Sequence, residues 1–194
     1  MESAKAAELV FERGHTYYSW ASTPIADATL GRIYDLAKLG PTSANCSPLR
    51  VAFIRSAEGK ELLRPALSKS NLQKAMSAPV VAVLATDTHY LDKVPELYPA
   101  PYDARSWFTQ TPTSAEENGI ANTYLQAGYF ILAARTLGLD CGPMSGFDRH
   151  IVDRAFFPNG AWRSRLLVNL GQGVDPEPYQ RRPRLGVADA CRFL

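Results

Sequence analysis

Residues 114–138 constrain the fold of this chain more than any other stretch. They open with Ser114-Ala115-Glu116-Glu117, a capping-box pattern typical of a helix N-terminus, and they end at a glycine. Apolar and small side chains occupy more than one face of the expected helix, which spans roughly 35 Å at 1.5 Å per residue. Such a helix is buried nearly all round, so we expect other elements to pack on several of its sides.

The rest of the chain alternates between helical and strand-like patterns. Three runs are typical of strands, and the second is expected to be covered on both faces: residues 49–54, 79–86 and 166–171. Helices are expected from Asp27 as a cap to Gly40-Pro41, over residues 57–67, and from Asp148 as a cap to Phe157. "CGPMSGF", residues 141–147, is expected to form a glycine-rich turn. This pattern predicts an α+β fold with three or four strands, and 194 residues fit one domain, 1–194.

The composition excludes several classes of protein. The chain has 21 Lys and Arg against 19 Asp and Glu, and a net charge of +2 is too small to indicate nucleic-acid binding. No stretch is apolar enough for a bilayer span or a signal peptide, so we expect a cytoplasmic protein that does not bind a membrane. Cys46, Cys141 and Cys191 form no Cys-x-x-Cys pair, and with only three histidines we expect neither disulfides nor a metal site.

The segment between His89 and Pro112 is rich in proline and tyrosine and contains Trp107-Phe108. Such a mixture sustains neither a long helix nor a central strand. The aromatic residues favour packing over disorder, which leaves two interpretations open. The segment is either a lid or interface excursion, or a structural surface loop.

Several local groups could bind a ligand, and each also has an ordinary structural reading. The cluster Arg181-Arg182-Pro183-Arg184 could bind a phosphate between two arginine side chains, or it could be an ordinary basic turn exposed to solvent. "ERGHTYYSW", residues 12–20, suits a phosphorylated aromatic ligand or contributes core aromatics. "GPMSG", residues 142–146, offers backbone amides against which a flat ligand could lie. Cys46 has no histidine in a recognisable context, so a small, partly buried thiol is favoured over a nucleophile.

Five motifs occur together and in a characteristic order. They are "LGPTSANCSP" at 39–48, "NLQK" at 71–74, "DARSWF" at 103–108, "LGLDCGPMSGFD" at 137–148 and Arg-Pro-Arg-Leu at 182–185. With these motifs the chain resembles the FMN-dependent nitroreductase superfamily, and within it the malonic semialdehyde reductase (3-hydroxypropanoate dehydrogenase) branch of the Rut pathway. The resemblance implies a central mixed, mainly antiparallel sheet flanked by helices, in an intertwined homodimer with two FMN molecules at the interface.

The resemblance also implies which residues hold the flavin. Asn71 and Lys74 would approach the isoalloxazine ring, and a Lys74 ammonium would stabilise negative charge at the edge of the reduced flavin. The neighbouring subunit would offer one group of pocket residues: Pro41, Thr42, Ser43 and Asn45. A second group would run along the flavin ring: Pro143, Met144, Ser145 and Gly146.

Two segments are candidates for the FMN phosphate. By resemblance Arg181, Arg182 or Arg184 would hold it, with Arg184 favoured together with one of the others. The family usually has an arginine shortly before the tryptophan of the N-terminal segment, whereas this chain has His15 followed by Thr16. Either His15 makes a weaker, pH-sensitive contact, or Arg13 reaches the phosphate instead.

The reaction that the resemblance implies is a ping-pong hydride transfer. NADH or NADPH reduces the flavin, which then reduces a small acceptor, by closest resemblance malonic semialdehyde to 3-hydroxypropanoate. Because the flavin carries the hydride, no catalytic side chain is expected. The alternatives are a broad nitro-compound or quinone reductase and, in a different class, a flavin-binding module without turnover. An acceptor with a carboxylate needs a cation nearby, and Arg105 and Arg149 are the candidates.

Overall fold

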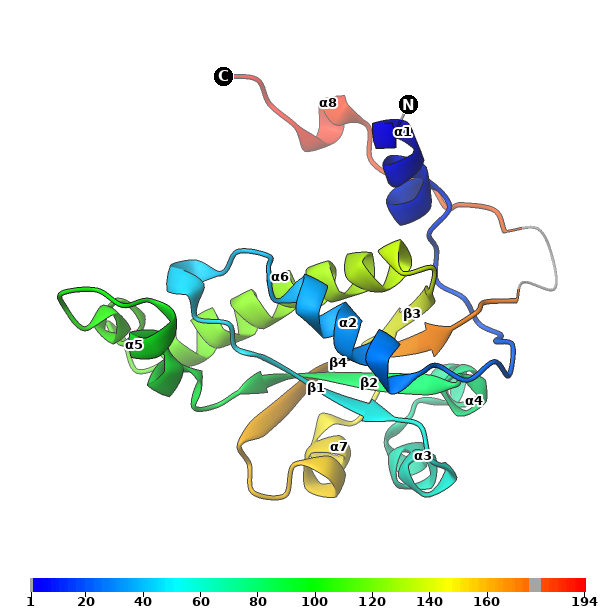
Figure 1. Ribbon diagram of the computed structural model, residues 1–194, viewed down its shortest axis with the longest axis horizontal. Coiled ribbons are helices and arrows are strands. Elements are labelled where there is room, and N and C mark those ends of the chain that lie inside the picture. Colours follow the sequence, from blue (N-terminus) through cyan, green and yellow to red (C-terminus); the bar gives the residue numbers. More distant parts are fainter. Residues whose placement is uncertain (1, 175–178) are drawn as a thin grey trace.

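The computed structural model describes residues 2–174 and 179–194 (Figure 1). The four strands form one antiparallel sheet in the order β1-β2-β4-β3: β1 (Leu49–Ile54), β2 (Val80–Asp87), β3 (Asp140–Met144) and β4 (Trp162–Gly171). The described residues also form eight α-helices, of which the first and the last lie away from the sheet: α1 (Glu2–Ala7), α2 (Asp27–Ala37), α3 (Ala57–Leu63), α4 (Lys69–Ser77), α5 (Val94–Leu97), α6 (Ser114–Thr136), α7 (Arg149–Phe156) and α8 (Val187–Ala190). The α+β prediction is confirmed. Parallel pairing occurs in the described residues only as a single bridge between Thr16 and Cys141.

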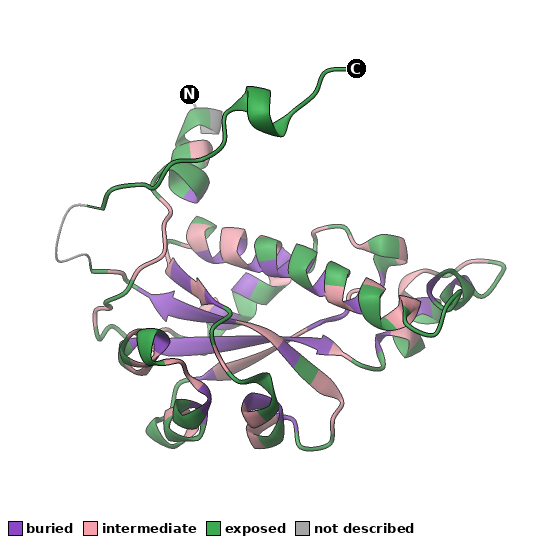
Figure 2. Cartoon of the chain, turned by 180° about the vertical axis from the view of Figure 1, so that it is seen from behind, coloured by how far each residue is buried: buried purple, intermediate pink, exposed green. Residues whose placement is uncertain are grey.

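Helices cover both faces of the sheet, and β2 lies between them. Its alternate residues Val80, Ala82 and Leu84 join a core cluster with α2 and α6, and the residues between them join a second cluster with α3, α4 and α7. Figure 1 shows the same two layers, and Figure 2 shows the sheet as the most continuously buried part of the molecule. The prediction that this strand is covered on both faces is confirmed.

The long helix α6 is not buried all round, contrary to the prediction. Phe130 and Gln126 are fully buried, whereas Leu125 and Gly128 on another face are exposed. A Cβ atom at Gly128 would meet nothing within 4 Å. Among the small residues of this helix, Ala121 and Gly128 therefore lie on an open stripe of the isolated chain, whereas Ala127 and Ala134 pack in the core.

Two predicted helix caps are wrong, although both helices begin where expected. Ser114 is the first residue of α6, and its hydroxyl donates to the Phe108 carbonyl at 2.8 Å instead of capping the helix. Asp27 is the first residue of α2 and forms an ion pair with Arg55. Asp148, in contrast, caps α7 as predicted, because its carboxylate accepts a hydrogen bond from the Ile151 backbone at 3.1 Å.

The expected glycine-rich turn is partly a strand, which corrects the prediction. Residues 140–144 form β3 and pair with β4, so the turn begins only at Ser145. Pro143 is tolerated because β3 is an edge strand. Gly142 is required by close packing, since a Cβ atom there would lie 3.0 Å from the Trp20 ring and 3.1 Å from the Tyr17 carbonyl.

Strand β4 is longer than predicted and contains a β-bulge. It begins at Trp162, four residues earlier than the apolar run that predicted it. Leu84 of β2 pairs with Leu166 and the next residue, Ala85, pairs with Ser164, so Arg165 has no partner in the ladder. A bulge bends the strand and turns one side chain in a new direction.

The proline-rich segment contains only short helices, as expected: a 3-10 turn (Tyr90–Lys93), α5 and a second 3-10 turn (Ala104–Phe108). Tyr90, Val94 and Phe108 pack around Cys46 in a third core cluster. In Figure 1 this segment forms the green lobe at one end of the molecule. The segment is therefore ordered by packing against the loop that follows α2.

The C-terminal residues form an arm that extends away from the sheet. All residues from 179 to 194 are exposed, including Leu185, Val187 and Phe193. The arm passes beside α1, as both ribbon views show (Figures 1 and 2). Among the helices of the described residues, none combines the length and hydropathy needed to cross a membrane.

Candidate flavin site

Helix α4 places Asn71 and Lys74 one turn apart on the same face. The side chain of Asn71 is buried, and its Nδ2 donates to the Gly146 carbonyl at 2.9 Å. The Lys74 ammonium lies 4.7 Å from the centre of the Tyr18 ring, a cation–π distance. Burial lowers the pKa of Lys74 below its ordinary value. The helix therefore presents an amide and a partly desolvated cation together.

The turn after β3 lies directly against this face of α4. Ser145 and Gly146 are exposed, and within the described part of the chain their backbone N–H groups make no hydrogen bond. A Cβ atom at position 146 would lie 2.8 Å from Asn71 Nδ2, so only glycine allows the two segments to meet at this distance. The turn thus offers two backbone N–H donors, those of Ser145 and Gly146, and the glycine has no side chain to shield them.

The N-terminal segment runs along the other side of β3. Thr16 forms a bridge with Cys141, and Trp20 Nε1 donates to the Lys74 carbonyl at 3.0 Å. The same carbonyl accepts from Asn169 Nδ2 at 3.1 Å. These contacts tie the N-terminal segment, α4 and the sheet into one continuous strip, which we call the ring strip: residues 16–20, 71–74 and 143–146.

His15 lies at the end of the ring strip between two aromatic rings. Its imidazole stacks on Tyr17 at 4.0 Å and on Tyr179 at 3.8 Å between ring centres. Its Nδ1 lies 3.1 Å from the Arg13 carbonyl and donates to it. The stacking fixes the imidazole in position next to Arg13.

The basic tail reaches this N-terminal segment through Arg181. Its Nη2 donates to the carbonyls of Glu12 at 2.6 Å, Gly14 at 2.9 Å and Phe11 at 3.2 Å. Arg184 Nη1 donates to the Arg182 carbonyl at 2.8 Å, and the Arg182 side chain is exposed. The structure thus brings the tail and the N-terminal segment together, with Arg181 holding the backbone on either side of Arg13.

The predicted residues of the loop after α2 lie elsewhere. We call residues 41–45 the crossing loop. The Ser43 backbone donates to Asn122 Oδ1 at 2.9 Å, Tyr129 donates to the Pro41 carbonyl at 3.1 Å, and Asn45 Nδ2 donates to the Leu97 carbonyl at 2.8 Å. The hydroxyl of Thr42 accepts from the backbone of Ser47 at 3.2 Å.

The backbone of the crossing loop is strained. Ala44 and Asn45 have φ angles of 44° and 51°, and Ser47, two residues after the loop, has a φ of 41°, all in the left-handed region that non-glycine residues rarely adopt. Strain of this kind persists only where the surroundings hold it in place, and it is concentrated at functional sites. Here Asn122 of α6 supplies the contacts that hold the loop.

Within the described residues, no hydrogen bond joins the crossing loop to the ring strip. The crossing loop contacts α6 at Asn122 and Tyr129, whereas the N-terminal segment contacts it at Arg135, whose Nη1 donates to the Val10 carbonyl at 2.8 Å. Asn122 lies 13 residues before Arg135, about 20 Å along a helix, and Tyr129 lies six residues before it, about 9 Å. The predicted pocket is therefore divided into two separate halves.

Cys46 is a packing residue in this structure. Its side chain is fully buried, and burial raises the pKa of the thiol to about 11. Since the thiolate is the reactive form, this thiol is inert near neutral pH. The described residues contain no group of three or more His, Cys, Asp or Glu side chains arranged to hold a metal ion.

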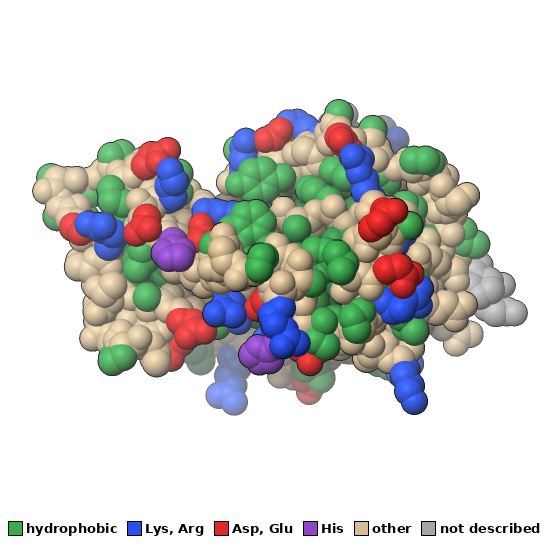
Figure 3. Space-filling model, turned by 90° about the horizontal axis from the view of Figure 1, so that it is seen from below, with side chains coloured by type: hydrophobic (Ala, Val, Ile, Leu, Met, Phe, Trp, Pro, Cys, Tyr) green, Lys and Arg blue, Asp and Glu red, His purple; other side chains and the backbone are tan. Residues whose placement is uncertain are grey.

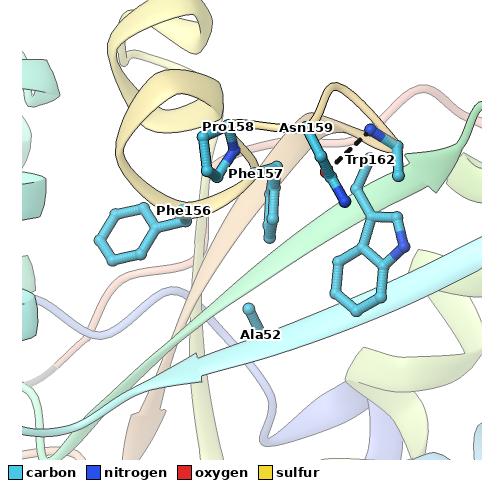
Figure 4. A pocket seen from close by; sticks show the side chains of 7 residues that line it. Ala52, Phe156, Phe157, Pro158, Asn159 and Trp162 are labelled. Carbon is cyan, nitrogen blue, oxygen red and sulfur yellow. Dashed lines mark hydrogen bonds between the residues drawn. The ribbon is translucent and has the colours of Figure 1, made fainter.

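The cavities of the chain only partly coincide with the predicted residues. One cavity of about 450 Å³ lies between β1 and the turn after α7, lined by Ala52, Phe157 and Trp162, and it contains none of them (Figure 4). Another, also about 450 Å³, lies beside Arg13 and is lined by Tyr17 and Arg135. The second cavity continues the cationic end of the ring strip.

Three polar residues at the site escaped sequence reasoning: Asn122, Arg135 and Asn169. Each acts through a contact with a segment distant in sequence, and no motif marks them. Asn169 Oδ1 is also the one buried side-chain acceptor of the described residues without a hydrogen-bond partner. Charged side chains of both signs are interspersed over the face of the molecule seen from below (Figure 3).

Comparison with known proteins agrees with this architecture. The model of the nitroreductase family matches residues 14–172. A nitroreductase-like protein of Bacillus subtilis superposes with a TM-score of 0.88 at 19% identity, over 99% of this chain and 100% of the other. Another from Exiguobacterium sibiricum, solved with FMN, gives 0.83 at 22% over 96% and 95%. A protein of the NAD(P)H:FMN oxidoreductase type from Staphylococcus epidermidis gives 0.81 at 18% over 95% and 94%. At these identities the structural similarity establishes the fold.

Proposed function

Since this chain belongs to the nitroreductase family, we propose that it is an FMN-dependent oxidoreductase that takes a hydride from NADH or NADPH and delivers it to a small acceptor. The observation that carries the proposal is the ring strip, where free backbone N–H groups at Ser145 and Gly146 lie beside Asn71 and Lys74. Bound FMN would supply reversible hydride chemistry, which protein side chains lack. The chain then has to hold the cofactor and adjust its charge.

The donors of the ring strip fit a flavin ring. An isoalloxazine carries carbonyl oxygens and ring nitrogens along its edges, and a backbone without side chains at Gly146 lets a flat ring approach. The N–H groups of Ser145 and Gly146 would donate to the ring. Lys74 would favour negative charge at the edge of the ring. Its ammonium is partly buried, which lowers its pKa and makes its charge act more strongly than in bulk water.

The cationic end of the ring strip fits the phosphate. Arg13, His15 and Arg181 converge there through the stacking and carbonyl contacts described above. Guanidinium groups bind phosphate oxygens through charge-assisted hydrogen bonds, and Arg181 retains N–H groups beyond the Nη2 that holds the backbone. Arg184, on the exposed C-terminal arm, would add a further contact.

A second copy of the chain would complete the pocket. In the described residues the hydrogen bonds of Pro41, Thr42, Ser43 and Asn45 go to α6, to Leu97 and within their own loop, and none goes to the ring strip of their own chain. A site built from both halves would therefore use two subunits. The exposed stripe of α6 around Leu125 and Gly128 and the exposed apolar residues of the C-terminal arm are surfaces that a homodimer would bury.

For the acceptor we propose a small aldehyde that carries a carboxylate, malonic semialdehyde being the best candidate by resemblance. Arg105 is occupied, because its Nε and Nη2 donate to the Asp103 carboxylate at 2.7 to 2.9 Å. Arg149 lies three residues after Gly146, and its Nη2 donates to the hydroxyl of Tyr124 at 3.2 Å. Arg149 is therefore the cation that supports an acidic acceptor.

Two measurements test this proposal. Purified protein should be yellow, and anaerobic NADH or NADPH should bleach it. Yellow protein that neither nucleotide bleaches would be a flavin-binding module without turnover, and protein unable to take up FMN would contradict both readings. Steady-state rates should be higher with malonic semialdehyde than with a nitroaromatic compound or a quinone. The opposite order would instead indicate a broad nitro-compound or quinone reductase.

A further inference from the structure

A separate cavity of about 410 Å³ lies where the end of β2, the start of β4 and the start of α6 meet. Its walls include Tyr90, Leu91 and Pro112 on one side and Arg163 and Arg165 on the other. It shares no lining residue with the ring strip or the crossing loop. The cavity and the ring strip lie at opposite ends of β2. Thr86 lines the cavity, whereas Val80, six residues or about 20 Å along the strand, marks the end nearer to the ring strip.

The bulge in β4 turns Arg165 into this cavity. Without a partner in the ladder, Arg165 directs its side chain to the same face as Thr86, and its Nε donates to the Thr86 hydroxyl at 3.0 Å. Only 12% of the side chain is exposed. An arginine this deep in a protein ordinarily has a close carboxylate partner, because burying a guanidinium alone is costly.

Arg165 has no close carboxylate partner in the described chain. The nearest, Glu116, lies 4.0 Å from its Nη2, and the Glu116 side chain is 72% exposed. Burial lowers the pKa of Arg165 and the nearby charge of Arg149 lowers it further, and the weaker opposing effects of Glu116, Tyr124 and Asp153 do not reverse this direction.

The other charged groups around the cavity differ from Arg165 in pairing or in burial. Asp87 is paired with Arg50 at 2.5 Å. Arg163 is half exposed, and its nearest carboxylate, that of Asp153, lies 3.8 Å away and also accepts from the Ser164 backbone at 2.8 Å. Arg165 is therefore the buried cation of the cavity that lacks a close carboxylate.

We propose that this cavity binds a small carboxylate whose apolar body lies against Tyr90, Leu91 and Pro112. The outer edge of the Arg165 guanidinium would hold the carboxylate through two parallel N–H donors, and Glu116 would move out into solvent. The size of the cavity is within the range of small-molecule sites, and its mixed lining fits a ligand with one charged end. The proposal does not depend on the flavin.

The competing reading is a structural ion pair that fastens the start of α6 to β4. The two readings give opposite predictions for Glu116, which is a partner in one case and a competitor of the ligand in the other. A loose, exposed ion pair contributes little to stability, so removing Glu116 should leave the fold intact.

The test is calorimetric titration of the purified protein, with and without added FMN, using benzoate as the ligand and neutral benzamide as the control ligand. Benzoate should bind and benzamide should not. Glu116→Gln should tighten benzoate binding by about threefold, and Arg165→Met should weaken it by about tenfold or more. Arg163→Met, at the rim, is the matched control and should have the smaller effect.

Three results would overturn the proposal. The first is benzoate that binds neither the unaltered protein nor Glu116→Gln. The second is binding that survives Arg165→Met while changing the flavin absorbance, which would place benzoate at the flavin. The third is a loss of benzoate affinity or of melting temperature in the Glu116→Gln variant, which is what the structural ion pair between Glu116 and Arg165 would predict. Should Arg165→Met fail to fold, Glu116→Gln and the benzamide comparison still decide between the two readings.

Discussion

Asn71 and Gly146 come from segments 75 residues apart and meet with no space between them. The Asn71 amide donates to the Gly146 carbonyl at 2.9 Å, and a methyl group at position 146 would lie 2.8 Å from the same nitrogen. The contact fixes the turn after β3 against α4 and leaves the outward N–H groups of Ser145 and Gly146 free. The proposed flavin face therefore depends on one hydrogen bond and one missing side chain.

We expect Gly146→Ala to weaken FMN binding by about tenfold, because the new methyl group separates Asn71 from the turn and moves both donors. Fluorescence titration of the apoprotein with FMN measures this. Gly31→Ala is the matched control, since a Cβ atom at this position of α2 meets nothing within 4 Å. That variant should bind FMN normally and gain about 0.5 to 1 kcal/mol in free energy of unfolding. Equal FMN affinity in both variants would contradict the proposed ring position.

The two arginines of the tail should behave differently. Arg184→Ala should weaken FMN binding by about tenfold and leave the melting temperature of the apoprotein unchanged, because its side chain contacts only neighbouring carbonyls. Arg181→Ala should lower both the FMN affinity and the melting temperature, since Arg181 also donates hydrogen bonds to three carbonyls of the N-terminal segment. Unchanged FMN affinity in both variants would move the phosphate to Arg13 or His15.

The proposed homodimer should depend on the open stripe of α6. Leu125→Glu should place a charge in the interface, give a monomer by light scattering and abolish FMN retention. Leu62→Glu is the control, because Leu62 is similarly exposed but lies on α3, below the opposite face of the sheet. A Leu125→Glu protein that remains dimeric and yellow would exclude this stripe as the interface.

Stability should fall in alkaline solution because the buried thiols resist ionisation. Burial raises the pKa of Cys46 to about 11 and that of Cys141 to about 12, both above the ordinary value of 9.0. The folded state thus holds the thiol protons more tightly than the unfolded chain, which favours folding below pH 9. This advantage is lost as the pH rises from 9 towards 11.

Urea unfolding at pH 8 and pH 10 measures this loss. The difference in free energy of unfolding between the two pH values should be smaller in Cys46→Ala than in the unaltered protein. Cys191→Ala is the control, because that thiol is exposed on the arm, and it should leave the difference unchanged. Equal pH dependence in all three proteins would show that Cys46 titrates normally.

The strain of the crossing loop should be measurable at Ala44. With φ at 44°, a β-branched side chain is strongly disfavoured, so Ala44→Val should lower the free energy of unfolding by about 2 kcal/mol. Ala44→Gly should be neutral or stabilising by up to about 0.5 kcal/mol, since glycine adopts this conformation freely. Urea denaturation of the two variants checks the difference, and an equal loss in both would mean that position 44 is not strained in solution.

Local sequence patterns predicted most of the sheet but not its edge. The apolar run at Leu49–Ile54 is β1, and the Val-rich run is β2 within one residue at each end. Strand β3 was missed because Gly142 and Pro143 are turn residues by composition. Their use in a strand depends on the tight packing of Trp20 and on an edge position, which are properties of the tertiary structure.

The candidate site shows the same division. Asn71, Lys74 and Gly146 belong to motifs, and the structure places them together. The contacts of Arg135 with Val10 and of Asn122 with Ser43 join segments far apart in sequence, and no spacing rule marks them. The bulge that redirects Arg165 is likewise a matter of strand register, which a single sequence does not display.

The distance between the crossing loop and the ring strip has a genetic consequence. In a homodimer that shares its pockets across the interface, a subunit with a damaged loop still offers a sound strip, and a subunit with a damaged strip still offers a sound loop. Two inactive alleles of this kind, expressed together, would form mixed dimers in which one pocket is built from two sound halves. Activity would return in the mixture although neither parent protein has any, whereas two alleles damaged in the same half would never restore it.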